Sequence, residues 1–263
     1  MTQTFRHHWP EYTIEAVCLG IFMVSAAGFA TLLQHPLSPL AGWTASPLAQ
    51  RIPMGAAMGL TLIAIIYSPA GARSGAHMNP VVTLTFLRLG KIAFADACAY
   101  VAAQFAGGFA GIVVADWVFR RLPEHPAVNY VATVPGMRGA AVAFAAESVI
   151  SFGMMLMVLG VSNTPRVARF TGLAAGLLVA CYITLEAPLS GMSMNPARSF
   201  GPALLAGTAG SLWIYFTAPL AGMLAAAELF VRARGRRRVR CAKLHHPLNV
   251  RCIFNCGFME TPA

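Results

Sequence analysis

The chain has 263 residues, of which 57% are hydrophobic and only 11% are charged. Soluble globular proteins carry about 25% charged residues, so this composition excludes a soluble domain and indicates an integral membrane protein. The formal net charge of +10 lies mostly outside the apolar segments, where basic residues contact anionic lipid headgroups. We therefore expect the lipid bilayer as a partner, and no nucleic acid.

Six apolar segments approach the length of about 20 residues that a helix needs to cross a bilayer. We expect them at residues 13–34, 53–70, 94–118, 140–161, 167–187 and 211–231. The first run is too long for the apolar region of a secretory signal. The segments form two repeats, residues 13–119 and 140–231, between an N-terminal segment, residues 1–12, and a basic tail, residues 232–263.

Each repeat also contains a short apolar stretch that opens on an Asn-Pro pair, residues 79–89 and 195–205. Pro80 and Pro196 suit the first position of a helix, and Asn79 and Asn195 suit its N-cap. Each stretch predicts a helix of about 16 Å, half of the roughly 30 Å hydrocarbon core. Because each repeat has three spans, the repeats insert with opposite topology. We expect an all-α membrane protein whose two re-entrant half-helices meet near the midplane.

The distribution of basic residues predicts the orientation. An even number of spans places both termini on one side of the membrane. The longest basic run lies within residues 232–243, and the positive-inside rule makes that side cytoplasmic. Arg120, Arg121 and Arg138 fall on the opposite side, but the tail outweighs them. We expect a protein of the plasma (inner) membrane.

The two Asn-Pro segments carry a family resemblance. Residues 74–80 (Ser-Gly-Ala-His-Met-Asn-Pro) and 195–202 (Asn-Pro-Ala-Arg-Ser-Phe-Gly-Pro) together resemble the paired signature of the aquaporin family, the major intrinsic proteins. The likeness covers about residues 11–231. It implies a homotetrameric water channel that is not an enzyme and needs no cofactor. It also implies that Glu15 and Glu147 brace the re-entrant loops by accepting backbone N–H groups.

The chemistry of the two motifs agrees with a pore. Two half-helices that meet at their N-termini direct the positive ends of both dipoles at the channel centre, which opposes cations but not neutral molecules. The Asn79 and Asn195 amides can donate to a passing oxygen. Backbone carbonyls before each motif can accept, at Gly75, Ala76, His77, Gly191, Met192 and Ser193. We expect His77 to supply backbone and packing rather than to bind a metal.

The selectivity filter is expected at four positions: Met58, Ile183, Met192 and Arg198. Arg198 is an ionisable residue at membrane depth, which indicates function, and its guanidinium repels cations. These positions are counted back from the motifs by comparison with the family pattern. If residues 70–73 contain no insertion relative to that pattern, Gly59 takes the position of Met58. If the count in the fifth span is off by one residue, Tyr182 takes the position of Ile183. The family usually has an aromatic residue and often a His in this filter.

Two solute classes therefore remain open. The apolar filter favours glycerol or another small neutral solute, such as hydrogen peroxide, ammonia or a metalloid acid. Ser199, Ala203 and the Tyr215-Phe216 pair instead resemble the water-selective branch of the family. We expect a passive water channel that excludes protons and ions. A different class, a closed-pore structural or sensor protein of the membrane, stays as an alternative.

The tail holds a second candidate site, formed by Cys241, His245, His246, Cys252 and Cys256. Cysteine and histidine are the ligands of structural zinc, and spacings of three residues can bring such side chains together. A zinc ion is therefore a candidate cofactor. A disordered basic tail with incidental cysteines, or a palmitoylated or redox-active cysteine, are the alternatives.

Overall fold

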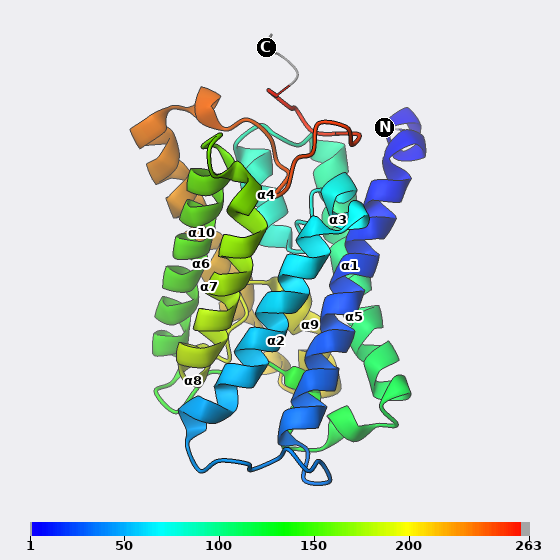
Figure 1. Ribbon diagram of the computed structural model, residues 1–263, viewed down its shortest axis with the longest axis vertical. Helices are drawn as coiled ribbons and strands as arrows, with labels where there is room; N and C mark the ends of the chain where they lie inside the picture. The colour runs from blue at the N-terminus through cyan, green and yellow to red at the C-terminus, as the bar shows by residue number, and fades with distance from the viewer. Residues whose placement is uncertain (1, 259–263) are drawn as a thin grey trace.

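The computed structural model describes residues 2–258, and its regular elements there are helices (Figure 1). The long helices are α1 (Thr2–Gln34), α2 (Pro47–Tyr67), α5 (Phe94–Val118), α6 (Ala140–Ser162), α7 (Thr171–Leu185) and α10 (Leu212–Arg234). The short ones are α3 (Pro69–Ser74), α4 (Pro80–Arg88), α8 (Ala187–Ser190) and α9 (Pro196–Leu205). Short 3-10 helices are η1 (Leu122–Glu124), η2 (Asn129–Val131), η3 (Ala168–Phe170), η4 (Ala209–Ser211) and η5 (Arg236–Arg238).

Within the described residues, six helical stretches are long and apolar enough to span a membrane, as the sequence predicts; the fifth, Ala168–Leu185, joins η3 to α7. The main difference lies at the N-terminus, where residues 2–12 continue α1 and do not form a separate segment. Polar residues attach this extension to α5: the Tyr12 hydroxyl donates to Asp96 at 2.5 Å, and His8 Nδ1 lies 2.8 Å from the same oxygen. The extra helical turns are therefore fixed by side-chain pairing that no apolar pattern reveals.

Close helix packing relates the two halves. Helix α1 packs along α5 in the first half, α6 packs along α10 in the second, and α2 packs on α7 between them. A Cβ atom on Gly107 would lie 2.1 Å from the carbonyl oxygen of Ala16, and one on Gly176 would lie 2.6 Å from that of Gly59. Only glycine fits at these contacts, which is the small-residue packing expected of membrane helices.

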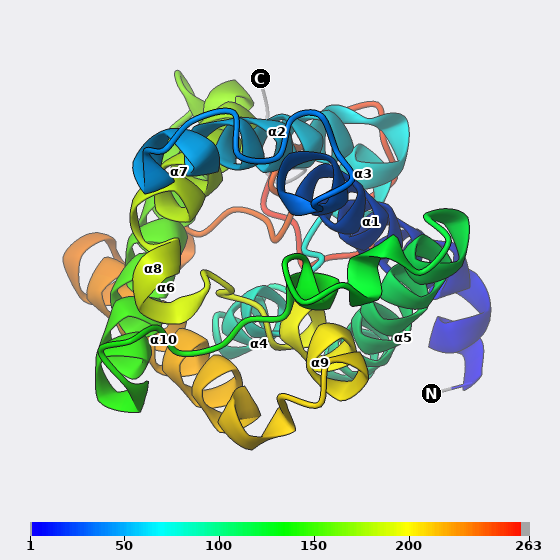
Figure 2. The same ribbon diagram turned by 90° about the horizontal axis from the view of Figure 1, so that it is seen from below.

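The long helices are arranged around an axis, and α4 and α9 complete the side of this arrangement between α5 and α10 (Figure 2). The described ends of the chain lie at the same end of the arrangement (Figure 1). Helix α4 comes from the first half of the chain and α9 from the second, and their N-termini meet in the interior. Large apolar side chains cover the outside of the arrangement, including Ile21, Leu60, Val149, Leu177 and Trp213. This exterior suits lipid contact.

Candidate functional site

A buried carboxylate organises the loop before α4. Glu15 accepts hydrogen bonds from the backbone N–H groups of His77 (3.0 Å) and Met78 (2.6 Å) and from the Ser74 hydroxyl (2.8 Å). The side-chain amide of Gln104 donates to it at 2.8 Å. In a bilayer each of these donors would otherwise be unsatisfied, at a cost of several kcal/mol. Glu15 thus lets irregular backbone exist at this depth.

The second half repeats this arrangement around Glu147. Its carboxylate accepts from the backbone N–H groups of Ser193 and Met194 and from the Ser190 hydroxyl, each at 2.7 Å. Both carboxylates are fully buried. The inverted repeat is therefore matched at the level of single hydrogen bonds.

The two loops also share an unusual backbone. Ala76, Met78, Met192 and Met194 all adopt left-handed conformations, with φ between 46° and 55°. Such a conformation costs about 1–2 kcal/mol for each residue that is not glycine. The bonds to the carboxylates hold it in place. The consequence is a row of loop residues that line a central cavity, Ala76, His77, Gly191, Met192 and Ser193.

Gly75 departs from the expected row of pore carbonyls. Its carbonyl accepts a hydrogen bond from the N–H of Leu244 in the tail at 3.1 Å, and it is not among the residues that line the cavity. The sequence motif alone carries no sign that a distant segment would use this acceptor. The expectation for Gly75 is therefore wrong. Two of the three expected residues, Ala76 and His77, line the cavity in the first half.

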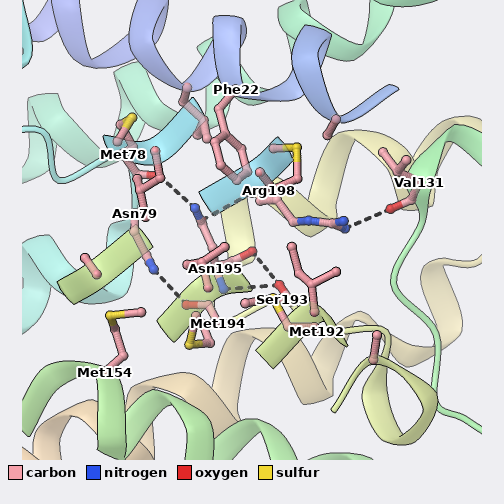
Figure 3. Close-up of a pocket in the computed structure, with 18 of the residues that line it drawn as sticks. Phe22, Met78, Asn79, Val131, Met154, Met192, Ser193, Met194, Asn195 and Arg198 are labelled. Carbon is pink, nitrogen blue, oxygen red and sulfur yellow. Dashed lines mark hydrogen bonds between the residues drawn. The ribbon is translucent and has the colours of Figure 1, made fainter. Parts of the chain in front are cut away.

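The asparagine side chains join the two halves at the centre (Figure 3). The Asn79 amide nitrogen donates to the carbonyl of Met194, and the Asn195 amide nitrogen donates to that of Met78, each at 2.7 Å. Their Oδ1 atoms cap α4 and α9, whose first residues are prolines. An amide nitrogen carries two protons, so each asparagine keeps one that is not needed for this contact. Both side chains line the cavity.

Arg198 lies on the first turn of α9 and lines the same cavity. Its Nη1 donates to the carbonyl of Val131 at 2.8 Å (Figure 3). Within residues 2–258 no carboxylate forms an ion pair with it. Its guanidinium is thus positioned by a neutral acceptor, and no carboxylate of the described residues contacts it.

The loop between α5 and α6 supplies partners that sequence reasoning missed. Val131, the acceptor for Arg198, has a left-handed backbone with φ of 53°. Thr133 bonds Ser199 through their hydroxyls (2.7 Å), and Ser199 in turn bonds Ser193 (2.6 Å). This segment carries no apolar periodicity and no motif, so nothing in the sequence marks it as part of the pore.

The cavity has a volume of about 310 Å³, and all four expected filter residues line it: Met58, Ile183, Met192 and Arg198. Gly59 packs against α7 instead, where a Cβ would lie 2.5 Å from the Gly176 carbonyl oxygen. Tyr182 points at Gly153 on α6, with its hydroxyl 2.7 Å from the position of a Cβ there. The structure therefore places Met58, and neither Gly59 nor Tyr182, on the cavity wall. Phe22 of α1 also lines it.

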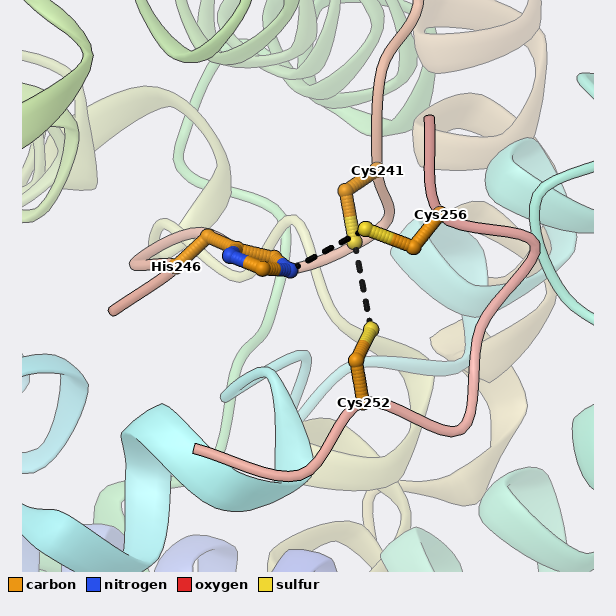
Figure 4. A group of neighbouring side chains, drawn as sticks. All are labelled: Cys241, His246, Cys252 and Cys256. Carbon is orange, nitrogen blue, oxygen red and sulfur yellow. Dashed lines mark hydrogen bonds between the residues drawn. The ribbon is translucent and has the colours of Figure 1, made fainter. Parts of the chain in front are cut away.

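The tail brings four of its five expected ligands together (Figure 4). One ligand atom each from Cys241, His246, Cys252 and Cys256 lies within 4.8 Å of all the others. His245 is not part of this group, because its ring packs edge-on against Tyr67 at 4.9 Å. The expectation for His245 is wrong, because the contact with Tyr67 takes its ring away from the cluster that His246 joins.

Inverted three-helix repeats, two half-helices and an axial cavity define a polytopic membrane channel. The chain belongs to the major intrinsic protein family, whose model matches residues 5–230. This is a family of channels and not of enzymes, and it confirms both the resemblance and the fold class that the sequence predicts. The tail lies beyond the matched residues.

Individual relatives agree with this assignment. The chain is 38% identical over 171 residues to aquaporin NIP1-3 of Oryza sativa subsp. japonica, over 64% of this chain and 57% of that protein. It is 37% identical over 177 residues to aquaporin NIP3-1 of Zea mays, over 66% of this chain and 57% of that protein. The match thus spans little more than half of each relative.

Among solved structures, the fold is similar to that of the aquaglyceroporin from Plasmodium falciparum, with a TM-score of 0.69 and 19% identity. That likeness covers 85% of this chain and 95% of the other. At this identity it supports the fold alone.

Proposed function

We propose that the protein conducts water passively, in both directions, down an osmotic gradient, and that it excludes protons and ions. The observation that carries this proposal is the reciprocal contact of Asn79 and Asn195 across the two halves. Each amide is held by one hydrogen bond and keeps a second proton for a solute oxygen. A water molecule that accepts from these amides directs its own protons away from the centre, which interrupts a proton-conducting chain of waters.

Electrostatics supports the exclusion of ions. The N-termini of α4 and α9 each contribute about half a positive charge at the centre. Arg198 adds a positive charge that forms no ion pair within the described residues. A cation therefore meets repulsion inside the cavity, whereas a neutral molecule does not.

A second candidate function is supported by the composition of the cavity wall. Three of the four filter positions are apolar, Met58, Ile183 and Met192, and Phe22 adds an aromatic face. A filter of three apolar side chains and one arginine suits the carbon side of a small polyol as well as water. Glycerol or another small neutral solute is therefore the alternative substrate.

Solute flux in proteoliposomes tests both candidates. The protein is treated with a zinc chelator before reconstitution, and stopped-flow light scattering then compares water, glycerol and hydrogen peroxide. We expect water permeability well above that of protein-free vesicles, with no added proton flux from a pH-sensitive dye. Fast glycerol flux would establish the second candidate. Permeability equal to that of protein-free vesicles would overturn both and favour a closed-pore sensor.

We also propose that both termini are cytoplasmic, that the membrane is the plasma (inner) membrane and that the protein is a homotetramer. The basic residues at the end of α10 and just beyond it, on the side where the described ends lie, support the orientation. The proposal of a homotetramer is based on membership of the major intrinsic protein family. Protease accessibility of the tail in inside-out vesicles and the mass of the detergent-solubilised protein by light scattering test these two points.

A further inference from the structure

The tail site has the geometry of a tetrahedral metal centre. The sulfur atoms of Cys241 and Cys252 are 3.6 Å apart, and Cys256 Sγ lies 3.2 Å from His246 Nε2. Zinc binds sulfur at about 2.3 Å and histidine nitrogen at about 2.0–2.1 Å, so tetrahedral ligand atoms lie about 3.5–3.8 Å apart. These side chains therefore need only small shifts to surround an ion.

The donor set also favours zinc over other cations. Three thiols and one imidazole form one of the usual closed sets for structural zinc and lack the oxygen ligands that calcium or magnesium require.

The residues between the first two ligands lie in the mouth of the pore. Leu244 lines the central cavity and is almost fully buried. Its N–H bonds the Gly75 carbonyl at 3.1 Å, and the Ala242 carbonyl lies 2.8 Å from His77 Nε2. The segment from Ala242 to Leu244 thus contacts the re-entrant loop of the first half. Figure 2 shows the tail, in orange to red, crossing the far end of the helix arrangement.

The rest of the tail is bound to the same mouth. Phe254, between the last two cysteines, stacks on the His77 ring with centroids 5.4 Å apart. The Lys243 ammonium donates to the carbonyl of Ala72 at 2.8 Å and to that of Arg251 at 2.5 Å. The stretches that contain Leu244 and Phe254 therefore contact the channel directly. The stretch that ends at Arg251 is linked to it through Lys243.

We propose that Cys241, His246, Cys252 and Cys256 bind one zinc ion, and that this ion holds residues 242–244 in the pore mouth as a closed plug. The described part of the tail after Arg238 has no helix, so the plug lacks secondary structure of its own. An ion that links four side chains removes the entropy of the free segment and favours the ordered, plugged state. The control of flux rests on the proposed function, whereas the metal site does not.

Metal content tests the site independently of flux. We expect the full-length protein to hold one zinc ion per chain, measured by inductively coupled plasma mass spectrometry. Substitution with cobalt is expected to give the visible bands of a tetrahedral thiolate centre. His246→Ala and Cys252→Ser should lose the ion. His245→Ala and Cys98→Ser are matched controls outside the group and should keep it. Thermal unfolding in detergent checks that each variant is folded.

Two results would overturn the site. A wild-type protein that stays free of zinc at micromolar zinc, with reduced thiols, would do so without any variant. A Cys241–Cys252 disulfide, detected in the intact mass under native conditions as the loss of two hydrogen atoms, would replace the metal as the link within the tail.

Flux tests the plug. Zinc-loaded and chelator-treated wild-type protein are reconstituted in parallel. We expect water permeability to rise about ten-fold on zinc removal, which corresponds to a shift of about 1.4 kcal/mol between plugged and open states. Equal and high permeability in both samples would overturn the plug and leave the proposed water channel standing. Equal and negligible permeability, with zinc bound as expected, would overturn the proposed function and the plug, but not the metal site.

Discussion

The two re-entrant loops have the same backbone and different surroundings. In residues 75–79 and 191–195, the same left-handed positions and the same carboxylate contacts recur. The first loop faces the tail through His77 and Gly75, whereas the second joins a chain of hydroxyls through Ser193. The repeated frame therefore creates the pore, while side chains outside that frame make its two ends different.

The largest effect should come from removing the carboxylates that hold the two re-entrant loops, Glu15 and Glu147. Glu15→Ala and Glu147→Ala each leave two buried backbone N–H groups without an acceptor, at about 1–3 kcal/mol each. We expect a loss of at least about 2 kcal/mol of stability, seen as a large drop in the thermal midpoint in detergent. Glu15 also binds Gln104, so its variant should lose more.

The half-buried Glu228, near the C-terminal end of α10, does not line the cavity and provides the control for this prediction. It pairs only with surface arginines of the described chain, and Glu228→Ala should stay within about 0.5 kcal/mol of wild type. A Glu147→Ala protein with the wild-type midpoint would show that the frame does not depend on the carboxylate.

The next effect concerns the positive charge of Arg198, which α9 places on the cavity wall. Two unit charges 4 Å apart repel or attract each other by about 4 kcal/mol at an effective dielectric constant of about 20. Arg198→Leu should therefore raise proton or sodium leakage at least about ten-fold in dye-loaded vesicles. Arg51→Leu is the matched control, because Arg51 also lines the cavity but lies near the loop end of α2. Leakage equal in both variants would contradict a special role for Arg198.

A smaller effect is expected at the filter wall. Met58→Ala removes a side chain that lines the cavity beside the second loop, so a larger opening remains. We expect glycerol permeability to increase several-fold relative to water. Tyr182→Phe is the control, since Tyr182 faces Gly153 and not the cavity. If Met58→Ala leaves the ratio of glycerol to water permeability unchanged while Tyr182→Phe alters it, Met58 does not determine selectivity and Tyr182 does.

The smallest effect tests how closely the two halves match. The Tyr100 hydroxyl donates to the Ser74 carbonyl at 2.7 Å, and the Tyr215 hydroxyl donates to that of Ser190 at 2.6 Å. Tyr100→Phe and Tyr215→Phe should each cost about 1 kcal/mol, measured by the same thermal unfolding. A clear inequality between them would show that one loop is more tightly fixed than the other.

Much of the fold is predictable because a bilayer allows few solutions. The six spans and both half-helices follow from segment length and from the Asn-Pro pairs, and the structure places the half-helices at Pro80–Arg88 and Pro196–Leu205. The family model confirms the channel fold. The extension of α1 to Thr2 is not predictable in this way, because its polar contacts join residues far apart in sequence.

The site is less predictable, since long-range contacts decide it. Motifs identify Asn79, Asn195 and Arg198, but not Val131, whose role depends on the shape of a loop without pattern. In the tail, spacing alone suggests five ligands, whereas the direction of adjacent side chains selects His246 and excludes His245. Similarly, nothing local predicts that Leu244 would reach the Gly75 carbonyl.

The crossed asparagine contacts have a consequence for the order of biosynthesis. Asn79 finds its carbonyl partner, Met194, only in the second half of the chain, which leaves the ribosome later. Until then the Asn79 amide and the Met78 carbonyl of the first re-entrant loop lack these hydrogen-bond partners in the bilayer core, where no water can replace them. The first half is thus inserted as an unfinished structure, and synthesis of the second half completes it.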